Sequence, residues 1–164
     1  MSDNVLFYGL GSMGTGMAHS LRRAGFPVNA FTNKPEVRQA FIDAGGESAD
    51  LATFAPEAAA VVIAVVNAAQ TEDILFGKTG LAERLPAGCV VIACPTIDPA
   101  DARQFEADCE ARGLLYLDAP ITQAALDRYQ QAIDEGRAHE DDASLVKTYL
   151  AEAGLHRPDR KGSG

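Results

Sequence analysis

Short apolar runs alternate with stretches of helical spacing over the first 120 residues of the chain. The apolar runs predict strands at Asn4–Tyr8, Val28–Phe31, Val61–Val66, Val90–Cys94 and Leu114–Leu117. Between them, helices are expected over Met13–Ala24, Glu36–Ala44 and Ala100–Arg112. Several of the strands are apolar on both faces, which is typical of a parallel sheet covered by helices on both sides. The pattern therefore predicts an α/β fold, a doubly wound and mainly parallel sheet with a short helical extension at its C-terminal end.

The pattern changes after Pro120, where no further strand is expected. Helical spacing covers Gln123–Glu135 and Ser144–Ala153, with an acidic turn at Glu140–Asp142 between them. We therefore divide the chain into a sheet-containing domain at residues 1–121, a helical segment at residues 122–155, and a disordered basic tail at residues 156–164.

Composition and charge narrow the classes of function. The 164 residues are 47% hydrophobic and 23% charged, with neither an apolar run near the roughly 18 residues that cross a membrane nor a secretory signal pattern. Cys89, Cys94 and Cys109 lack paired metal-ligand spacing, and an odd count leaves one thiol unpaired, which favours a reducing, cytoplasmic setting. The net charge of −9 argues against nucleic acid as a partner, because phosphates would be repelled. Residues 1–40 nevertheless carry a net charge of +2, which either suits an anionic ligand or arises by chance.

A glycine-rich turn joins the first predicted strand to the first predicted helix, with the sequence Gly9-Leu10-Gly11-Ser12-Met13-Gly14. Gly9 permits a tight turn, Gly11 leaves space for a pyrophosphate to approach the backbone, and Gly14 lets the helix pack closely on the strand. The N–H groups and the positive dipole end of the helix would then face the phosphates. We interpret this segment as the dinucleotide-binding turn of a Rossmann-type domain, and the alternative is a plain tight turn.

The residues after the second predicted strand bear on the choice of dinucleotide. An NAD-specific fold usually places Asp or Glu there to bind the ribose 2′-hydroxyl, whereas this chain has Thr32, Asn33 and Lys34. No carboxylate stands in this segment to repel a 2′-phosphate, and Lys34 could pair with one. NADP is therefore expected, with NAD as the alternative. The competing interpretation is a loop whose lysine points to water.

Further motifs follow the glycine turn in order: Thr-Gly-Met-Ala-His-Ser-Leu-Arg-Arg-Ala-Gly, Val65-Val66-Asn67, Gly80-Leu81-Ala82, Pro95-Thr96-Ile97-Asp98-Pro99 and Leu117-Asp118-Ala119-Pro120. With these motifs the chain resembles the β-hydroxyacid dehydrogenases, the family of 3-hydroxyisobutyrate dehydrogenase. The stretch from Asn67 to Gly77 is most similar to the L-threonate dehydrogenase branch. The resemblance implies hydride transfer between NAD(P) and a 3-hydroxy acid, with Val65, Val66 and Asn67 on the adenosine side of the cofactor and Thr96 near the nicotinamide ribose. Helix capping is the alternative for Thr96, although Asp98 is the better candidate for that role.

The resemblance breaks after Ile121. The family continues there with a substrate-contacting Ser-Gly-Gly, whereas this chain has Thr122-Gln123-Ala124, and the catalytic lysine of the family and its neighbouring asparagine have no match. Residues 136–149 instead resemble the far C-terminal end of the family, which an internal deletion near Ile121 would explain. We therefore assign no catalytic residue and no metal ligand. We interpret Lys147 as surface charge and the acidic turn as carboxylates that favour the positive end of the following helix.

Two classes of function stay open. In the first, the chain is a member of an NAD(P)-dependent oxidoreductase family that binds cofactor without turnover, and it uses a small 3-hydroxy acid only where the missing domain is supplied. In the second, it is a non-catalytic dinucleotide-binding module or an inactive remnant. The helices after residue 122 either cover apolar sheet surface or pair two chains into a homodimer.

Overall fold

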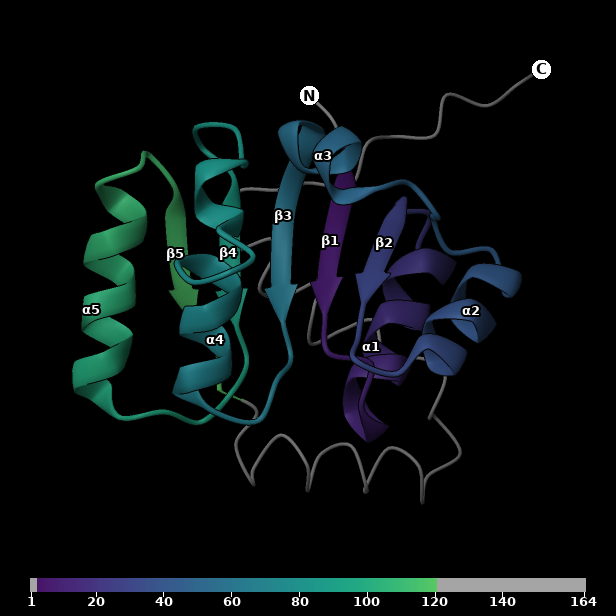
Figure 1. The fold of residues 1–164 in the computed structure, drawn as a ribbon, viewed down its shortest axis with the longest axis horizontal. Helices are drawn as coiled ribbons and strands as arrows, with labels where there is room; N and C mark the ends of the chain where they lie inside the picture. Colours follow the sequence, from purple (N-terminus) through teal and green to yellow (C-terminus); the bar gives the residue numbers. More distant parts are fainter. Residues whose placement is uncertain (1–2, 121–164) are drawn as a thin grey trace.

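The computed structural model describes residues 3–120, which form a sheet of five strands with every neighbouring pair parallel (Figure 1). The strands are β1 (Asn4–Tyr8), β2 (Val28–Phe31), β3 (Ala58–Ile63), β4 (Val90–Ala93) and β5 (Leu115–Asp118). Their spatial order is β2-β1-β3-β4-β5. The chain therefore leaves β1 toward β2 and later returns to the opposite side of β1 to form β3.

Helices pack on both faces of this sheet. They are α1 (Ser12–Arg23), α2 (Pro35–Asp43), α3 (Leu51–Phe54), α4 (Ala68–Leu75) and α5 (Pro99–Glu110), with 3₁₀ turns η1 (Ala55–Glu57) and η2 (Leu81–Glu83). On one face the buried apolar side chains of β1, α1 and α2 include Val5, Phe7, Met17, Leu21 and Phe41. On the other face those of β1, α3, α4 and α5 include Leu6, Tyr8, Phe54, Leu75 and Cys109. The predicted α/β architecture, a doubly wound parallel sheet, is thereby confirmed.

The third strand lies three residues earlier than the prediction Val61–Val66. β3 already begins at Ala58, because its backbone pairs with β1 from Ala58 and with β4 from Ala60, over an alanine-rich stretch whose own preference for strand is weak. After Ile63 the Ala64 N–H still donates to the Tyr8 carbonyl oxygen at 2.7 Å, and the chain then turns into α4. Within residues 3–120, the other predicted strands and helices differ from the observed bounds by one or two residues at an end, or not at all.

The segment between α2 and α3 extends the sheet beyond β2 by a single parallel bridge. Asn29 and Glu47 form this bridge, and the Glu47 N–H donates to the Val28 carbonyl oxygen at 2.8 Å. The Asn29 side chain is fully buried, and its Nδ2 donates to the Ala49 carbonyl oxygen at 2.7 Å. These bonds hold the crossing segment against the outer edge of β2 before the chain returns to form β3.

All of the cysteines are free thiols in the interior of the described domain. Cys94 packs on the α1 face of the sheet, whereas Cys89 and Cys109 pack on the α5 face. Burial raises the pKa of the Cys89 and Cys94 thiols to about 12 and that of Cys109 to about 11. The three side chains therefore act as small apolar groups of the core.

The predicted helical segment at residues 122–155 and the tail at residues 156–164 lie outside the described residues. Among residues 3–120, no helix combines the length and the apolar content needed to cross a membrane.

Candidate functional site

A cavity of about 620 Å³ opens at the carboxyl ends of β1, β2 and β3. The connection from β1 runs to one side of that strand and β3 lies on its other side, so the cavity sits where the strand order reverses. Open α/β sheets bind their ligands at this position. The lining residues are Tyr8, Gly9, Leu10, Gly11, Phe31, Thr32, Asn33, Lys34, Ala64, Val65, Val66, Asn67, Ala69, Gln70, Asp73, Ile74 and Thr79.

Two of the three motif glycines are required by the protein itself. Gly9 has a φ of +104°, and a Cβ there would overlap the Ala64 carbonyl oxygen. At Gly14 a Cβ would overlap the Gly9 carbonyl oxygen and stand 3.3 Å from the Phe7 ring, so close packing of α1 on the turn depends on this glycine. Gly11 differs, because it has an ordinary extended backbone (φ −80°, ψ −167°) and a Cβ there would meet no atom within 4 Å. Space is therefore left at Gly11 on the cavity side of the turn.

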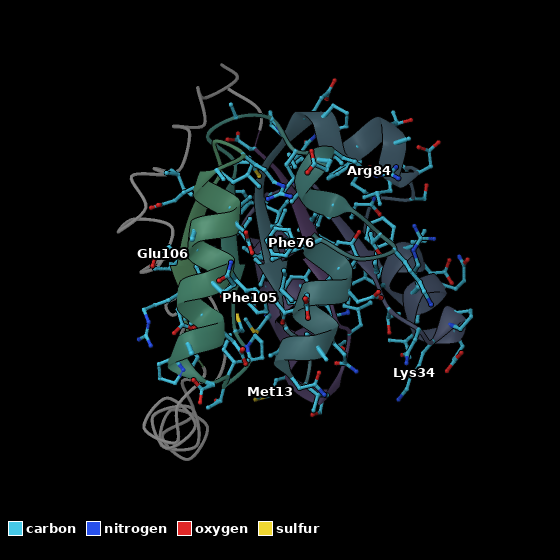
Figure 2. The ribbon with its side chains drawn as sticks, turned by 60° about the vertical axis from the view of Figure 1, so that its left-hand side comes forward. Met13, Lys34, Phe76, Arg84, Phe105 and Glu106 are labelled. Carbon is cyan, nitrogen blue, oxygen red and sulfur yellow. The ribbon has the colours of Figure 1, made fainter. Side chains whose placement is uncertain are left out.

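The amino end of α1 is open toward this turn. Gly11 is the N-cap and offers no side chain to cap the helix, and the first turn contains no acidic residue. Ser12, Met13 and Gly14 form that first turn, beside the cavity but outside its lining. In Figure 2, Met13 and Lys34 both lie at the lower edge of the molecule, at the carboxyl ends of the strands in Figure 1. Uncapped N–H groups and the positive dipole end make this a favourable position for an anion.

The segment after β2 forms one wall of the cavity. Thr32, Asn33 and Lys34 line it, and the Lys34 N–H lies 3.4 Å from the Thr32 Oγ1. Beneath them the Phe31 ring stacks on the Tyr8 ring, with centroids 5.0 Å apart. Arg38 of α2 places its guanidinium 5.2 Å from the Phe31 centroid and donates from Nε to the Ala30 carbonyl oxygen at 3.1 Å. Two cationic side chains thus lie at or near this wall.

The opposite wall comes from the turn after β3 and from α4. Val65, Val66 and Asn67 line the cavity, and the Val66 side chain is 81% exposed. Asn67 is the N-cap of α4, and its Oδ1 accepts from the Gln70 N–H at 3.0 Å. Gln70 in turn accepts the Val66 N–H on its Oε1 at 3.0 Å, so turn and helix are joined in both directions.

Thr96 lies apart from these walls. It is exposed in the connection between β4 and α5 and does not line the cavity. Asp98 caps α5, since its Oδ1 accepts from the Ala100 N–H at 2.7 Å. The capping alternative for Thr96 is therefore wrong. Thr96 follows the carboxyl end of β4, so the predicted place near the nicotinamide ribose stays a prediction.

Several lining residues were not singled out from the sequence. They are Tyr8, Phe31, Ala64, Ala69, Gln70, Asp73, Ile74 and Thr79. Four of them lie on α4, a helix that is absent from the elements predicted above, although Asn67 and Gln70 stand at the spacing of a helix cap. Asp73 adds a carboxylate to the cavity, and burial raises the pKa of the Tyr8 hydroxyl to about 12. Over residues 3–120, no group of three or more His, Cys, Asp or Glu side chains could hold a metal ion.

Comparison with known proteins identifies the domain. Residues 4–129 match the NAD binding domain of 6-phosphogluconate dehydrogenase. The L-threonate dehydrogenase of Cupriavidus necator is 45% identical over 126 residues, which are 76% of this chain and 42% of the relative. A 3-hydroxyisobutyrate dehydrogenase of Pseudomonas aeruginosa is 38% identical over 123 residues, 74% of this chain and 41% of the relative.

A solved structure gives the same result. The crystal structure of 3-hydroxyisobutyrate dehydrogenase from Salmonella typhimurium superimposes with a TM-score of 0.68 at 37% identity, over 77% of this chain and 45% of that one. The chain spans about two fifths of the length of the curated relatives above. The matches confirm the resemblance to the β-hydroxyacid dehydrogenases and to their L-threonate branch. The chain belongs to the family defined by the NAD-binding domain of 6-phosphogluconate dehydrogenase, in the group that contains the 3-hydroxyisobutyrate and L-threonate dehydrogenases.

Proposed function

We propose that residues 3–120 bind a nicotinamide dinucleotide in the cavity at the carboxyl ends of β1, β2 and β3. The observation that carries this proposal is the open space at Gly11, beside the uncapped amino end of α1. Neither the backbone nor the packing of the protein requires glycine there, whereas a pyrophosphate approaching the turn does. The residues from Gly9 to Gly14 would hold the pyrophosphate, and Val65, Val66 and Asn67 would lie along the adenosine.

NADP is proposed as the preferred cofactor. The wall after β2 has no carboxylate at Thr32, Asn33 or Lys34, so a 2′-phosphate there would meet no close repulsion. Lys34 lines the cavity, and the Arg38 guanidinium lies over the neighbouring Phe31 ring. A cation beside the ribose favours the phosphorylated form through Coulomb attraction and hydrogen bonding.

We propose that this chain descends from enzymes that carry out the chemistry of the family. We also propose that the chain itself does not turn over substrate. The bound nicotinamide would exchange a hydride with the carbon of a 3-hydroxy acid. That reaction needs a group to move the hydroxyl proton and cations or amides to hold the carboxylate. The predicted nicotinamide ribose site, Thr96, follows β4. The ionisable side chains among the described lining residues are Tyr8, Lys34 and Asp73, and none of them follows that strand. A second domain or chain would have to supply the missing groups.

A cofactor-binding module without catalytic use is the second candidate, favoured by this same distribution of ionisable groups. The two candidates differ in one observable, the consumption of substrate when another chain supplies the missing domain. NADPH formation from L-threonate or 3-hydroxyisobutyrate by the purified chain would overturn the proposal of no turnover. If that activity were also lost in Lys147→Ala, the lysine interpreted as surface charge would be a working group.

Calorimetric titration with NADPH and NADH tests the binding proposal. Gly11→Val should abolish binding while leaving the thermal midpoint close to that of the parent, because the new side chain fills ligand space and not core. Gly16→Ala is the matched control on the same helix, since its Cβ also meets no atom within 4 Å but lies outside the cavity lining. Equal affinity of Gly11→Val and the parent would remove the glycine turn from the binding site.

The cofactor preference has its own variant. Thr32→Asp would place a carboxylate in the cavity wall and should shift the ratio of NADPH to NADH affinity toward NADH by about tenfold or more, the equivalent of about 1.4 kcal/mol. A parent protein that binds NADH more tightly than NADPH would contradict the proposal.

A further inference from the structure

The β3–α4 turn owes its conformation to a pair of reciprocal hydrogen bonds. Asn67 Oδ1 accepts from the Gln70 N–H, and Gln70 Oε1 accepts from the Val66 N–H, both at 3.0 Å. Asn67 also accepts twice on its carbonyl oxygen, from the Thr71 N–H and the Thr71 hydroxyl at 3.2 Å. Thr71 is fully buried, so this set of bonds ties the turn to a fixed point in the core.

Packing alone does not hold the tip of this turn. The Val66 side chain is 81% exposed and therefore makes few contacts with the described protein. α4 buries Thr71 and Leu75 in the core and gives Ala69, Gln70, Asp73 and Ile74 to the cavity. Although Gln70 lies on the cavity side, its amide oxygen is occupied by the turn. The Val66 backbone is thus held by a side chain that could otherwise have pointed to water.

We propose that Gln70 is a positioning residue for the adenosine end of the cofactor, acting through the Val66 N–H, an inference that rests on the proposed function above. Val66 and Ile74 both line the cavity, and by holding the Val66 backbone Gln70 would keep the Val66 side chain in place for the flat face of the nucleoside. A turn fixed before binding loses less conformational freedom when the ligand arrives, and this raises affinity without a direct contact.

Gln70→Met tests the role, because methionine keeps the length and the helix preference of the side chain but replaces the amide oxygen with a sulfur that is only a weak acceptor. We expect NADPH and ADP-ribose to bind about two- to tenfold more weakly, by the same factor, as follows from the loss of one net hydrogen bond. ADP-ribose lacks the nicotinamide but keeps the adenosine, so an equal factor excludes the nicotinamide end as the source of the effect. A loss for NADPH alone would overturn the assignment.

A rescue variant separates positioning from direct contact. Glutamate can accept the Val66 N–H but has no amide donors, so Gln70→Glu should restore affinity if Gln70 acts through the turn. Combining it with Glu72→Gln, an exposed residue of the same helix outside the cavity lining, keeps the charge of α4 unchanged. If this double variant binds as weakly as Gln70→Met, the amide contacts the ligand itself and the proposal is wrong.

Asp50→Ala is the control for general destabilisation. Asp50 caps α3 by accepting from the Thr53 N–H at 2.8 Å, and α3 lies at the opposite end of the sheet from the cavity (Figure 1). This control should lower the thermal midpoint without changing the affinity for ADP-ribose. If the parent binds neither probe, the proposed function fails; if the parent binds and Gln70→Met matches it, only the role of Gln70 is refuted.

Discussion

Replacing Gly14 with alanine tests the closest contact between α1 and the glycine turn. The new Cβ would overlap the Gly9 carbonyl oxygen and would lie 3.1 Å from the Gly9 carbonyl carbon and 3.3 Å from Phe7 Cε1. The obstacle is mainly backbone, which cannot rotate away as a long side chain can. The methyl group can therefore be accommodated only if α1 or the turn moves, and both are packed on the core, α1 through Ala18 and Leu21 and the turn through Leu10.

Two opposing contributions set the expected change in the free energy of unfolding. Overpacking of a well-ordered contact costs about 1–3 kcal/mol. Alanine in place of glycine within a helix returns about 1 kcal/mol. Because backbone atoms form the contact, the cost should lie in the upper part of its range, and Gly14→Ala should destabilise the protein by about 1–2 kcal/mol net.

Gly16→Ala is the matched substitution, two residues further along α1, where a Cβ meets no atom within 4 Å. It should gain stability, up to about 1 kcal/mol, so the two variants should differ by about 2 kcal/mol. Urea denaturation followed by circular dichroism measures this difference as a shift of the midpoint at unchanged slope. Equal midpoints for the two variants would refute the argument that helix–turn contact fixes glycine at position 14.

Asn29→Ala should cost about 2 kcal/mol or more in the same urea assay, because it opens space in the core and leaves the Ala49 carbonyl oxygen without its donor. Burial, and to a smaller extent Arg22 and Arg23, lowers the pKa of His19 below its usual 6.5 in the folded protein. As the pH falls below 6.5, the unfolded chain therefore binds a proton at His19 before the folded chain does, so the free energy of unfolding should rise with pH in the window just below pH 6.5. His19→Gln should flatten this slope in pH-dependent thermal melts. Glu83→Gln should change the free energy of unfolding by no more than about 0.5 kcal/mol, because its ion pair with Arg112 is exposed; a larger loss would contradict this estimate.

The sequence predicts best those strands and helices whose apolar pattern and end residues favour the same conformation that packing in the fold requires. β1 and β2 have the predicted bounds, since each is a short apolar run ended by a polar or glycine residue, and α1 combines helical spacing with a glycine stop at Gly25. β3 shows the opposite case. Ala58 and the alanines that follow it carry little strand preference, and only pairing with β1 and β4 makes them strand.

In the candidate site too, some residues can be predicted from local sequence and others depend on tertiary pairing. The glycine turn and the segment after β2 are each a continuous stretch of sequence, so the lining residues within each stretch could be predicted from local pattern. Tyr8 and Phe31 could not, because their stacking depends on the register between β1 and β2, which no local pattern specifies. α4 was missed since eight residues with a short apolar stripe give a weak periodic signal, even though Asn67 and Gln70 are a recognisable cap.

The buried thiols described above give the domain built-in chemical reporters of local opening. With pKa values of about 11 to 12, the thiolate, which is the reactive form, makes up less than about one part in 10³ at neutral pH. Because the three thiols are also buried, alkylation of the folded protein is expected only when the structure around them opens. Label on Cys89 and Cys109 without label on Cys94 would record departure of α5, and label on Cys94 alone would record opening of the α1 layer. Locating the labels by peptide mass would thus reveal which side of the sheet opens first.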